Sequence, residues 1–358
     1  MLKELKFLFN RLPFYVIFYP TSRCNARCPH CYNYTRQDNA ALSDELNIDE
    51  INRISKNMGH VKVLTISGGE PFLRDDLSEI IAIFYKNNGL QYVSFHTNAF
   101  LSDKVVSTTE KVLRTLKGIN VIVCISIDCI GEEHDRFRGV TNGFSRILET
   151  IEGLKALKNN YKNLTLVTST IYSHSTINSF EDTIKYIQDN IKGVKPSLSF
   201  VRGDTKDSEE KSVDYIKYQQ FCKNFVYTPG KNTPIFSPIA FKDAIEALTA
   251  RVVVANYKNK KQTIRCQAGK KLVVIYENGD VYPCETLKDK FGNLRDVNYD
   301  IGQLLFSEKG NKMLRDMQQQ NFCHCTWENV IPINLLFSPR HYLDILFAWA
   351  KLFLLRRK

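Results

Sequence analysis

Residues 14–31 read FYVIFYPTSRCNARCPHC, and this stretch decides the fold. Its first part, 14–19, is an apolar and β-branched run that is typical of a buried strand. Three thiols follow at once, Cys24, Cys28 and Cys31, in the spacing Cys-x-x-x-Cys-x-x-Cys. Because parallel α/β folds build their sites at the carboxyl ends of strands, the sequence predicts a three-thiol site after the first strand.

Strand-like and helix-like segments alternate from the cysteines to residue 201. The expected strands are residues 14–19, 61–67, 92–96, 121–127, 164–171 and 198–201. The expected helices between them are residues 48–58, 75–88, 103–116, 144–158 and 180–191. Such alternation predicts βα units around a parallel sheet. Six strands are fewer than the eight of a closed barrel, so an α/β class with an open, partial (β/α)6 TIM-like barrel is expected.

Five units are expected along the chain. They are an amphipathic segment at 1–13, the partial barrel at 14–210, linking helices at 211–255, a smaller domain at 256–340, and an apolar helix with basic residues at 341–358. The smaller domain is expected to combine helices with a β-hairpin, whose strands at 272–276 and 280–282 are joined through Asn278-Gly279. An Asn-Gly pair favours such a turn because both residues adopt positive φ at little cost.

The apolar and basic character of the two ends leaves two interpretations open. Basic residues beside an apolar helical face favour contact with anionic lipid headgroups, which would make the protein a peripheral membrane protein. Alternatively, both segments pack on the open side of the barrel or on a partner subunit.

Composition places the chain among globular proteins. Its 358 residues are 43% hydrophobic and 24% charged. They contain no run of 18 uncharged apolar residues that would predict a spanning helix, and no secretory signal is recognisable at the start. A cytoplasmic location is expected, either free in the cytoplasm or bound to the inner face of the membrane. The net charge is +11 with a pI near 9.0, but the lysines are scattered, so no nucleic-acid partner is expected.

Seven of the ten cysteines fall into two groups. The first is the loop above, and the second is Cys266, Cys284, Cys323 and Cys325. Without an export signal, such groups favour metal ligation over disulfides. Three thiolates can hold three corners of an iron–sulfur cubane and leave one iron open, whereas zinc prefers four protein ligands. The second group suits either zinc or a cubane. Of the three isolated cysteines, Cys124 and Cys222 are expected to be small buried side chains. The role of Cys129 is left open, because it lies at the end of a strand where the site is expected.

The first cysteine loop resembles that of the radical S-adenosylmethionine (SAM) superfamily, with His30 in the position usually held by an aromatic residue. Further along, Ser67-Gly-Gly-Glu-Pro71, Thr97-Asn98, Ser126-x-Asp128 and an arginine ten residues later resemble motifs of the same superfamily. The resemblance implies a 4Fe-4S cluster on the three thiols and reductive cleavage of SAM to a 5′-deoxyadenosyl radical. The residues implied to contact SAM are His30, Gly68, Gly69, Glu70, Asn98, Ser126, Asp128 and Arg138, the last by pairing with the methionyl carboxylate.

The second group resembles the SPASM and Twitch domains of radical SAM enzymes, through its Cys266-x12-Gly279-x4-Cys284 spacing. A full SPASM domain carries about seven cysteines, so four predict a Twitch-like domain with one auxiliary 4Fe-4S cluster that relays electrons. Asn329 stands where relatives often have a further cysteine.

The resemblance predicts an enzyme that oxidises, cross-links or otherwise modifies a carbon–hydrogen bond. The substrate is expected to be a peptide, a small molecule or a lipid-linked molecule, and the electron donor a protein such as flavodoxin or ferredoxin. No catalytic side chain is assigned. Two alternatives stay open at this point, namely a non-catalytic iron–sulfur electron carrier or sensor, and a zinc-stapled nucleic-acid binder.

Overall fold

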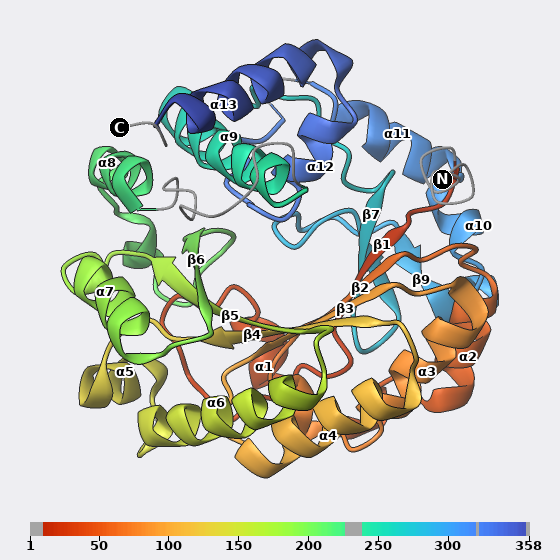
Figure 1. The fold of residues 1–358 in the computed structure, drawn as a ribbon. Helices are drawn as coiled ribbons and strands as arrows, with labels where there is room; N and C mark the ends of the chain where they lie inside the picture. The colour runs from red at the N-terminus through yellow and green to blue at the C-terminus, as the bar shows by residue number, and fades with distance from the viewer. Residues whose placement is uncertain (1–9, 226–237, 320–321, 356–358) are drawn as a thin grey trace.

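A single curved sheet forms the centre of the molecule (Figure 1). The computed structural model describes residues 10–225, 238–319 and 322–355. Nine strands lie in the order β6-β5-β4-β3-β2-β1-β7-β8-β9, so that β6 and β9 form the edges and the sheet does not close. Most of the expected amphipathic segment at 1–13 lies outside the described residues.

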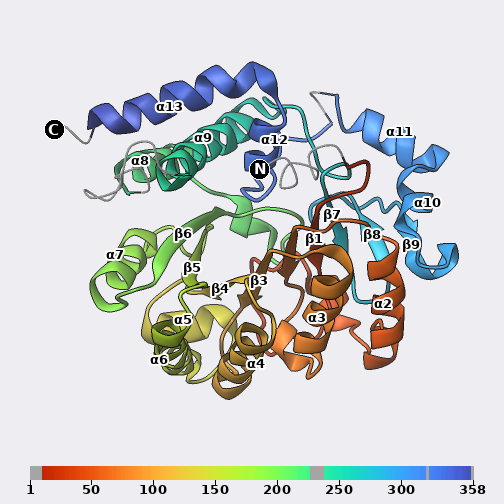
Figure 2. The same cartoon turned by 45° about the vertical axis from the view of Figure 1, so that its right-hand side comes forward.

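The first six strands confirm the predicted partial barrel. They are β1 (Tyr15–Phe18), β2 (Val63–Ile66), β3 (Tyr92–Thr97), β4 (Asn120–Ser126), β5 (Leu164–Tyr172) and β6 (Lys195–Phe200), and neighbours pair in parallel. Figures 1 and 2 show the helices on the convex side of this sheet. These helices are α2 (Ile48–Lys56), α3 (Leu77–Asn88), α4 (Ser102–Thr115), α5 (Gly131–Arg138), α6 (Gly143–Asn160) and α7 (Phe180–Asn190).

Local signals fix where several of these helices begin and end. Asn47 and Glu50 form a reciprocal capping box at the start of α2, which satisfies two backbone N–H groups that the first turn leaves free. Helix α3 ends at Gly89 in the left-handed conformation, φ 70°. The short helices α1 (Tyr34–Asp38) and α5 were not expected from the sequence, because both are brief and polar and carry little apolar periodicity.

The predicted hairpin forms, and it extends the barrel sheet. Strand β7 (Leu272–Ile275) pairs in parallel with β1, and β8 (Asp280–Tyr282) pairs antiparallel with β7. A short strand, β9 (Gly292–Asn293), completes the edge. The register places Phe18 opposite Ile275, and the Tyr19 N–H donates to the Ile275 carbonyl at 2.8 Å. The second cysteine group is thereby attached to the strand that leads into the first.

The remaining helices follow the barrel in the chain. They are α8 (Tyr215–Phe225), α9 (Pro238–Asn259), α10 (Ile301–Leu305), α11 (Glu308–Asp316), α12 (Ile331–Leu336) and α13 (Tyr342–Leu355). Figure 1 shows α9 and α13 side by side on the side of the molecule between β6 and β7. Within the described ranges, no helix combines the length and the apolar character that crossing a membrane requires.

Candidate functional site

The loop after β1 brings the three predicted thiols together. Cys28 is buried, Cys24 and Cys31 are half-buried, and the Cys31 N–H donates to the Cys28 carbonyl at 3.3 Å. Burial is the main cause that raises the pKa of Cys24 to about 12 and that of Cys31 to about 11, and neighbouring thiols of the loop contribute to both increases, together with Glu70 in the case of Cys24. The three sulfur atoms therefore lie close enough to act on one another. They form an all-sulfur donor set, which suits an iron–sulfur cluster.

Two glycines clamp this loop against the end of β2. The Gly69 N–H donates to the Thr21 carbonyl at 3.0 Å, and the N–H of the next residue donates to the Arg23 carbonyl at 2.8 Å. A Cβ atom on Gly69 would lie 2.0 Å from the Arg23 carbonyl oxygen, and one on Gly68 would lie 2.4 Å from the Thr21 oxygen. Gly68 also has φ +121°, which side chains rarely adopt. These glycines therefore let two backbone segments touch, and they hold the cysteine loop in place.

Glu70 joins the ends of β2 and β3. Its buried carboxylate accepts the Thr97 hydroxyl at 2.7 Å and the Asn98 N–H at 2.8 Å. Burial raises the pKa of Glu70 to about 7, although these donors favour the charged form. Asn98 in turn donates its side-chain amide to the Asn25 side chain at 2.7 Å, and that amide lies 4.0 Å from the Cys24 sulfur. A chain of polar contacts thus leads from β2 through β3 to the cysteine loop.

Asp128 and Arg138 form a buried pair at the end of β4. The Arg138 guanidinium donates to Asp128 through Nε at 2.9 Å and through Nη2, and the Ile171 N–H donates to the other carboxylate oxygen at 3.1 Å. Burial opposes the charge on Asp128, but Arg138 outweighs it and keeps the pKa of Asp128 below its usual value. Arg138 was expected to pair with a carboxylate of SAM, and in this structure its partner is Asp128. Ser126, the last residue of β4, lies opposite Ser169 of β5.

His30 lies in the cysteine loop and stacks on Phe137 of α5, with ring centroids 5.0 Å apart and planes 14° apart. Burial lowers its pKa to about 4, so the ring is neutral at physiological pH. Its buried Nδ1 has no hydrogen-bond partner in the described part of the chain. An aromatic stack and a free ring nitrogen beside the thiols suit a position next to a planar, hydrogen-bonding ligand.

The second group of thiols also comes together. Cys266 precedes β7 and Cys284 follows β8, whereas Cys323 and Cys325 precede α12. Burial raises the pKa of Cys325 well above its usual value, and Cys266, Cys323 and Cys284 raise it further. Two donors reach these sulfur atoms: the Gln262 side-chain amide lies 2.9 Å from the Cys323 sulfur, and the backbone N–H of Trp327 lies 3.4 Å from the Cys325 sulfur. Donors to sulfur stabilise thiolates, so these contacts also suit a bound cluster.

All ten cysteines are free thiols, and three of them belong to neither group. Cys124 is buried in β4 and Cys222 in α8, as expected. Cys129 is buried just after β4, where it accepts the Ser179 hydroxyl at 3.6 Å. In the described residues, no three His, Cys, Asp or Glu side chains are arranged to hold a single metal ion.

A charged network that the sequence did not reveal joins the chain segments that carry the two thiol groups. Its centre is Arg202, just after β6, which donates to Glu285 through Nε at 3.2 Å and Nη2 at 3.0 Å and lies 3.9 Å from Glu328. Tyr19 donates its hydroxyl to Glu285 at 2.7 Å and shares a 2.7 Å hydrogen bond with the Tyr32 hydroxyl. We call these five residues the arginine network.

Chain adjacency ties the arginine network to both thiol groups. Tyr32 directly follows Cys31, Glu285 directly follows Cys284, and Glu328 lies three residues after Cys325. In the sequence, the only sign that Tyr32 and Glu285 belong to the site is that each directly follows a cysteine. Burial raises the pKa of Glu328 to about 7, although Arg202 lowers it.

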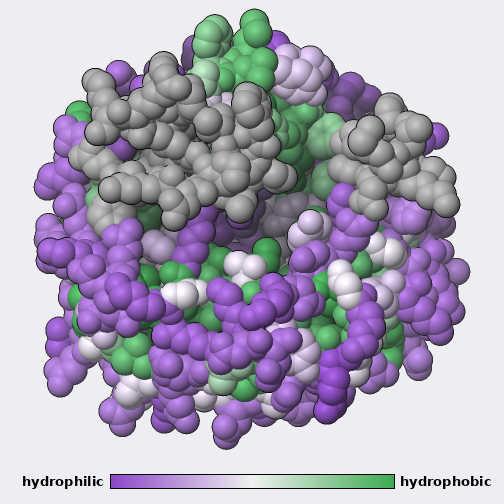
Figure 3. Space-filling view, viewed as in Figure 1, coloured by the Kyte–Doolittle hydropathy of each residue, from purple (hydrophilic) through white to green (hydrophobic). Residues whose placement is uncertain are grey.

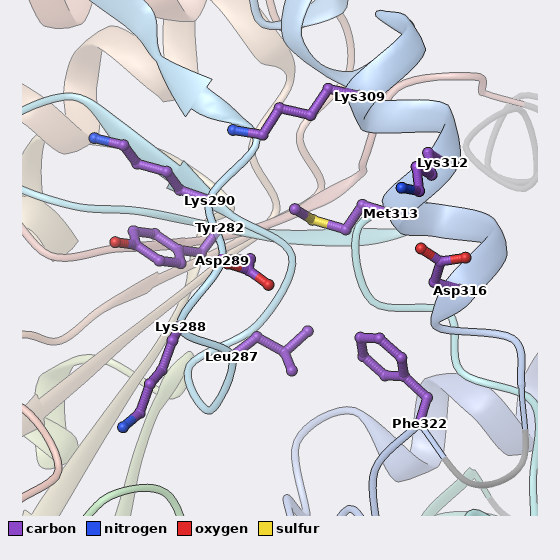
Figure 4. Close-up of a pocket in the computed structure, with 10 residues that line it drawn as sticks. All are labelled: Tyr282, Leu287, Lys288, Asp289, Lys290, Lys309, Lys312, Met313, Asp316 and Phe322. Carbon is purple, nitrogen blue, oxygen red and sulfur yellow. The ribbon is translucent and has the colours of Figure 1, made fainter.

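A cavity of about 390 Å³ opens to the surface between the segment that starts at the end of β8 and helix α11 (Figure 4). Leu287 and Phe322, which lie near Cys284 and Cys323 in the chain, line it together with Met313 of α11. We call it the basic cavity, because its lining also includes four lysines and two aspartates, which are Lys288, Lys290, Lys309, Lys312, Asp289 and Asp316.

Comparison with known families gives the same two regions. The radical SAM superfamily pattern matches residues 18–187, which include the first three thiols and the ends of β1 to β4. The iron–sulfur cluster-binding domain called SPASM matches residues 266–326, which include all four thiols of the second group. The chain therefore contains a radical SAM domain and a SPASM domain. These domains imply a 4Fe-4S cluster and SAM for the first region and auxiliary iron–sulfur ligation for the second.

Among curated relatives, this radical SAM protein is similar to the antilisterial bacteriocin subtilosin biosynthesis protein AlbA of Bacillus subtilis. The two are 26% identical over 333 residues, 88% of this chain and 64% of AlbA, so the chain spans less than two thirds of that relative. It is also 27% identical to the AdoMet-dependent heme synthase of Methanosarcina barkeri, over 77% of this chain and 78% of that protein.

Solved structures share the fold. The structure of anSMEcpe with bound AdoMet and Cp18Cys peptide covers 96% of this chain at a TM-score of 0.60 and 18% identity. Streptococcus suis SuiB bound to the precursor peptide SuiA covers 94% at a TM-score of 0.53 and 17% identity. These likenesses confirm the α/β architecture, with its open parallel sheet and SPASM region.

Proposed function

We propose that this radical SAM protein is an enzyme that modifies a carbon–hydrogen bond of a peptide. The observation that carries the proposal is the arginine network, which links the segments of both thiol groups at the carboxyl end of the sheet. A substrate bound there would lie between a site that generates radicals and a site that exchanges electrons.

In this proposal the first thiol group, Cys24, Cys28 and Cys31, holds a 4Fe-4S cluster with one iron open to SAM. That cluster, when bound, supplies the electron that splits SAM into methionine and a 5′-deoxyadenosyl radical. The second group, Cys266, Cys284, Cys323 and Cys325, holds one auxiliary cluster. Metal binding requires deprotonated thiols, and the bound metal supplies the positive charge that offsets the high thiol pKa values.

The protein residues around the first group position it and shield it from water. The two glycines and Glu70 fix the cysteine loop, and Arg138 places a buried positive charge near Cys28 and Cys24. The proposed contacts to SAM are those implied by the superfamily motifs, namely His30, Gly68, Gly69, Glu70, Asn98, Ser126, Asp128 and Arg138. Of these, His30 is the best placed for the adenine because it is neutral and stacked, and it retains a free ring nitrogen.

Charge favours a peptide over a polyanion at the arginine network. Arg202 is already opposed by two carboxylates, Glu285 and Glu328, so a further anionic group would meet net repulsion. The backbone N–H groups or a basic side chain of a peptide could instead donate hydrogen bonds to the carboxylates of Glu285 and Glu328. The names of AlbA and of the SuiB–SuiA complex also concern peptides.

A tetrapyrrole is the second candidate substrate, and a specific observation favours it. The match to the heme synthase covers similar shares of both proteins, 77% and 78%. Tetrapyrroles of heme synthesis, however, carry several carboxylates. The arginine network has one arginine and two glutamates, so its charge disfavours such a substrate.

For the electron partner, we propose an acidic electron-transfer protein such as flavodoxin or ferredoxin. The basic cavity suits it, because Lys309 and Lys312 are exposed on α11 and the cavity reaches the chain beside Cys284 and Cys323. Charge-steered association there would exchange electrons with the second group.

The decisive experiment is anaerobic reconstitution followed by counting of iron, sulfide and 5′-deoxyadenosine. We expect about eight irons per chain, which is two cubane clusters. The triple variant Cys24→Ala/Cys28→Ala/Cys31→Ala is expected to retain about four irons and to form no 5′-deoxyadenosine. The control is Cys124→Ala, which removes a buried thiol outside both groups and should change neither quantity.

Three outcomes would contradict the proposal. If the triple variant still forms 5′-deoxyadenosine, the first group is not the site of SAM cleavage. If the wild type binds about eight irons but never cleaves SAM, it is an electron carrier or sensor. If it binds zinc and no sulfide, both cluster assignments fail.

A further inference from the structure

Helix α13 is apolar on two opposite faces. Ile345 and Ala348 are buried on the face that packs toward α9. On the other face Leu343, Leu346 and Phe347 are 66%, 51% and 72% exposed, and Ala350 is exposed as well. These four residues follow the spacing i, i+3, i+4, i+7, which places them on one side of a helix. We call them the α13 stripe, and Figure 3 shows apolar residues gathered at the top of the molecule, over this helix.

The residues around the α13 stripe are basic. Arg340 precedes the helix, Lys351 is exposed within it, and the sequence continues with Arg356-Arg357-Lys358. One acid, Asp344, lies between residues 329 and 358, and it pairs with His341 at 2.8 Å. An apolar face bordered by cations is complementary to a surface that combines acyl chains with anionic headgroups.

We propose that the α13 stripe binds the surface of an anionic lipid bilayer, with α13 lying in the plane of the interface. Fourteen residues of helix span about 21 Å, which is shorter than the roughly 30 Å hydrocarbon core. The helix is therefore suited to lie on the membrane rather than to cross it. Its inner face stays packed on α9, so the whole enzyme would be held at the surface.

Charge argues against a second copy of this chain as the occupant. In a two-fold dimer the stripe would face itself, and basic residues at either end of one helix would meet basic residues of the other. Such like-charge contacts oppose association, whereas anionic headgroups favour the same residues. The α13 stripe is independent of the arginine network, so this inference does not rest on the proposed function.

The test is sedimentation of the holoenzyme with vesicles. Vesicles of phosphatidylcholine with phosphatidylglycerol should bind the wild type, and vesicles of phosphatidylcholine alone should bind it at least about tenfold more weakly. The variant Leu346→Gln/Phe347→Gln should lose about tenfold or more of the binding to anionic vesicles. The control Leu42→Gln removes another apolar side chain, 67% exposed, and should leave binding unchanged.

A second variant and a second measurement keep the inference testable. Lys351→Glu keeps the α13 stripe and should weaken binding to anionic vesicles while leaving circular dichroism and iron content unchanged. Equal binding of wild type and Leu346→Gln/Phe347→Gln would overturn the proposal. It would also be overturned if sedimentation equilibrium without lipid showed a wild-type dimer that this variant abolishes, because the stripe would then be a subunit interface.

Discussion

Removing Arg202 tests whether the arginine network holds the two thiol regions together. Its guanidinium donates twice to Glu285 and lies 3.9 Å from Glu328, and the side chains of these three residues are only 15%, 3% and 19% exposed. Arg202→Met would leave both carboxylates without their counter-ion. Breaking a buried pair from one side costs about 3–5 kcal/mol of unfolding free energy, because the remaining charge is uncompensated.

A double-mutant cycle separates the pair from the effects of lost packing. Glu285→Gln removes the charge that Arg202 opposes, so the double variant should be destabilised by less than the sum of the single variants. The expected coupling is about 1–3 kcal/mol, measured by denaturant unfolding of anaerobic protein. A coupling below about 0.5 kcal/mol would refute the view that the network is energetically connected.

The same variant should show a pH dependence of known sign. Burial raises the pKa of Glu328 from 4.5 to about 7. Between these values the folded state binds more protons than the unfolded state, so this group lowers stability as the pH rises from 4.5 to about 7. Losing Arg202 raises the folded pKa further. The deficit of Arg202→Met should therefore be larger at pH 8 than at pH 5, and an equal deficit at both pH values would contradict this reasoning.

Three further changes have distinct expected outcomes. Gly69→Ala would place a methyl group 2.0 Å from a backbone oxygen of the cysteine loop, so about half of the iron and all SAM cleavage should be lost. Gly118→Ala, at φ +76° and with no atom within 4 Å of its Cβ, adds backbone strain without such a clash and should retain both in the same assays. Lys309→Glu/Lys312→Glu should slow reduction by an acidic flavodoxin about tenfold at low salt, in stopped-flow absorbance, with little change when dithionite is the reductant. Cys266→Ser should lower the iron count from about eight to about four with SAM cleavage retained, and a loss of cleavage would show that the two sites do not load independently.

The strands of the barrel could be predicted because their sequences differ strongly from what surrounds them. Strands such as Tyr15–Phe18 and Val63–Ile66 are short apolar runs between polar segments, and the structure places both in the sheet. Helix α5 (Gly131–Arg138) was missed because a polar sequence of eight residues gives no usable periodicity. Its position is set by the buried pair of Arg138, its last residue, and Asp128, which lies three residues before its start.

The sequence predicts the thiols of the candidate site, but it predicts less well the residues that hold those thiols in place. Cysteine spacing alone indicated two groups, and both come together. Gly69 and Arg138 also contact other parts of the chain that the sequence does not place beside them, and their expected contacts to SAM stay predictions. Arg202 could not be identified at all, since its partners lie 83 and 126 residues further along the chain.

Pairing between β1 and β7 sets the distance between the two thiol groups. Residues Tyr15 to Phe18 pair in register with Leu272 to Ile275, so the cysteine loop after β1 and the hairpin before Cys284 start from adjacent strand ends. A one-residue slip would turn every side chain of β7 to the opposite face of the sheet. Because β7 is buried throughout, such a slip is strongly opposed, and the four backbone pairs fix where Glu285 meets Tyr19. The spacing of the two proposed clusters is therefore a property of sheet register, which a flexible linker between two separate domains would not provide.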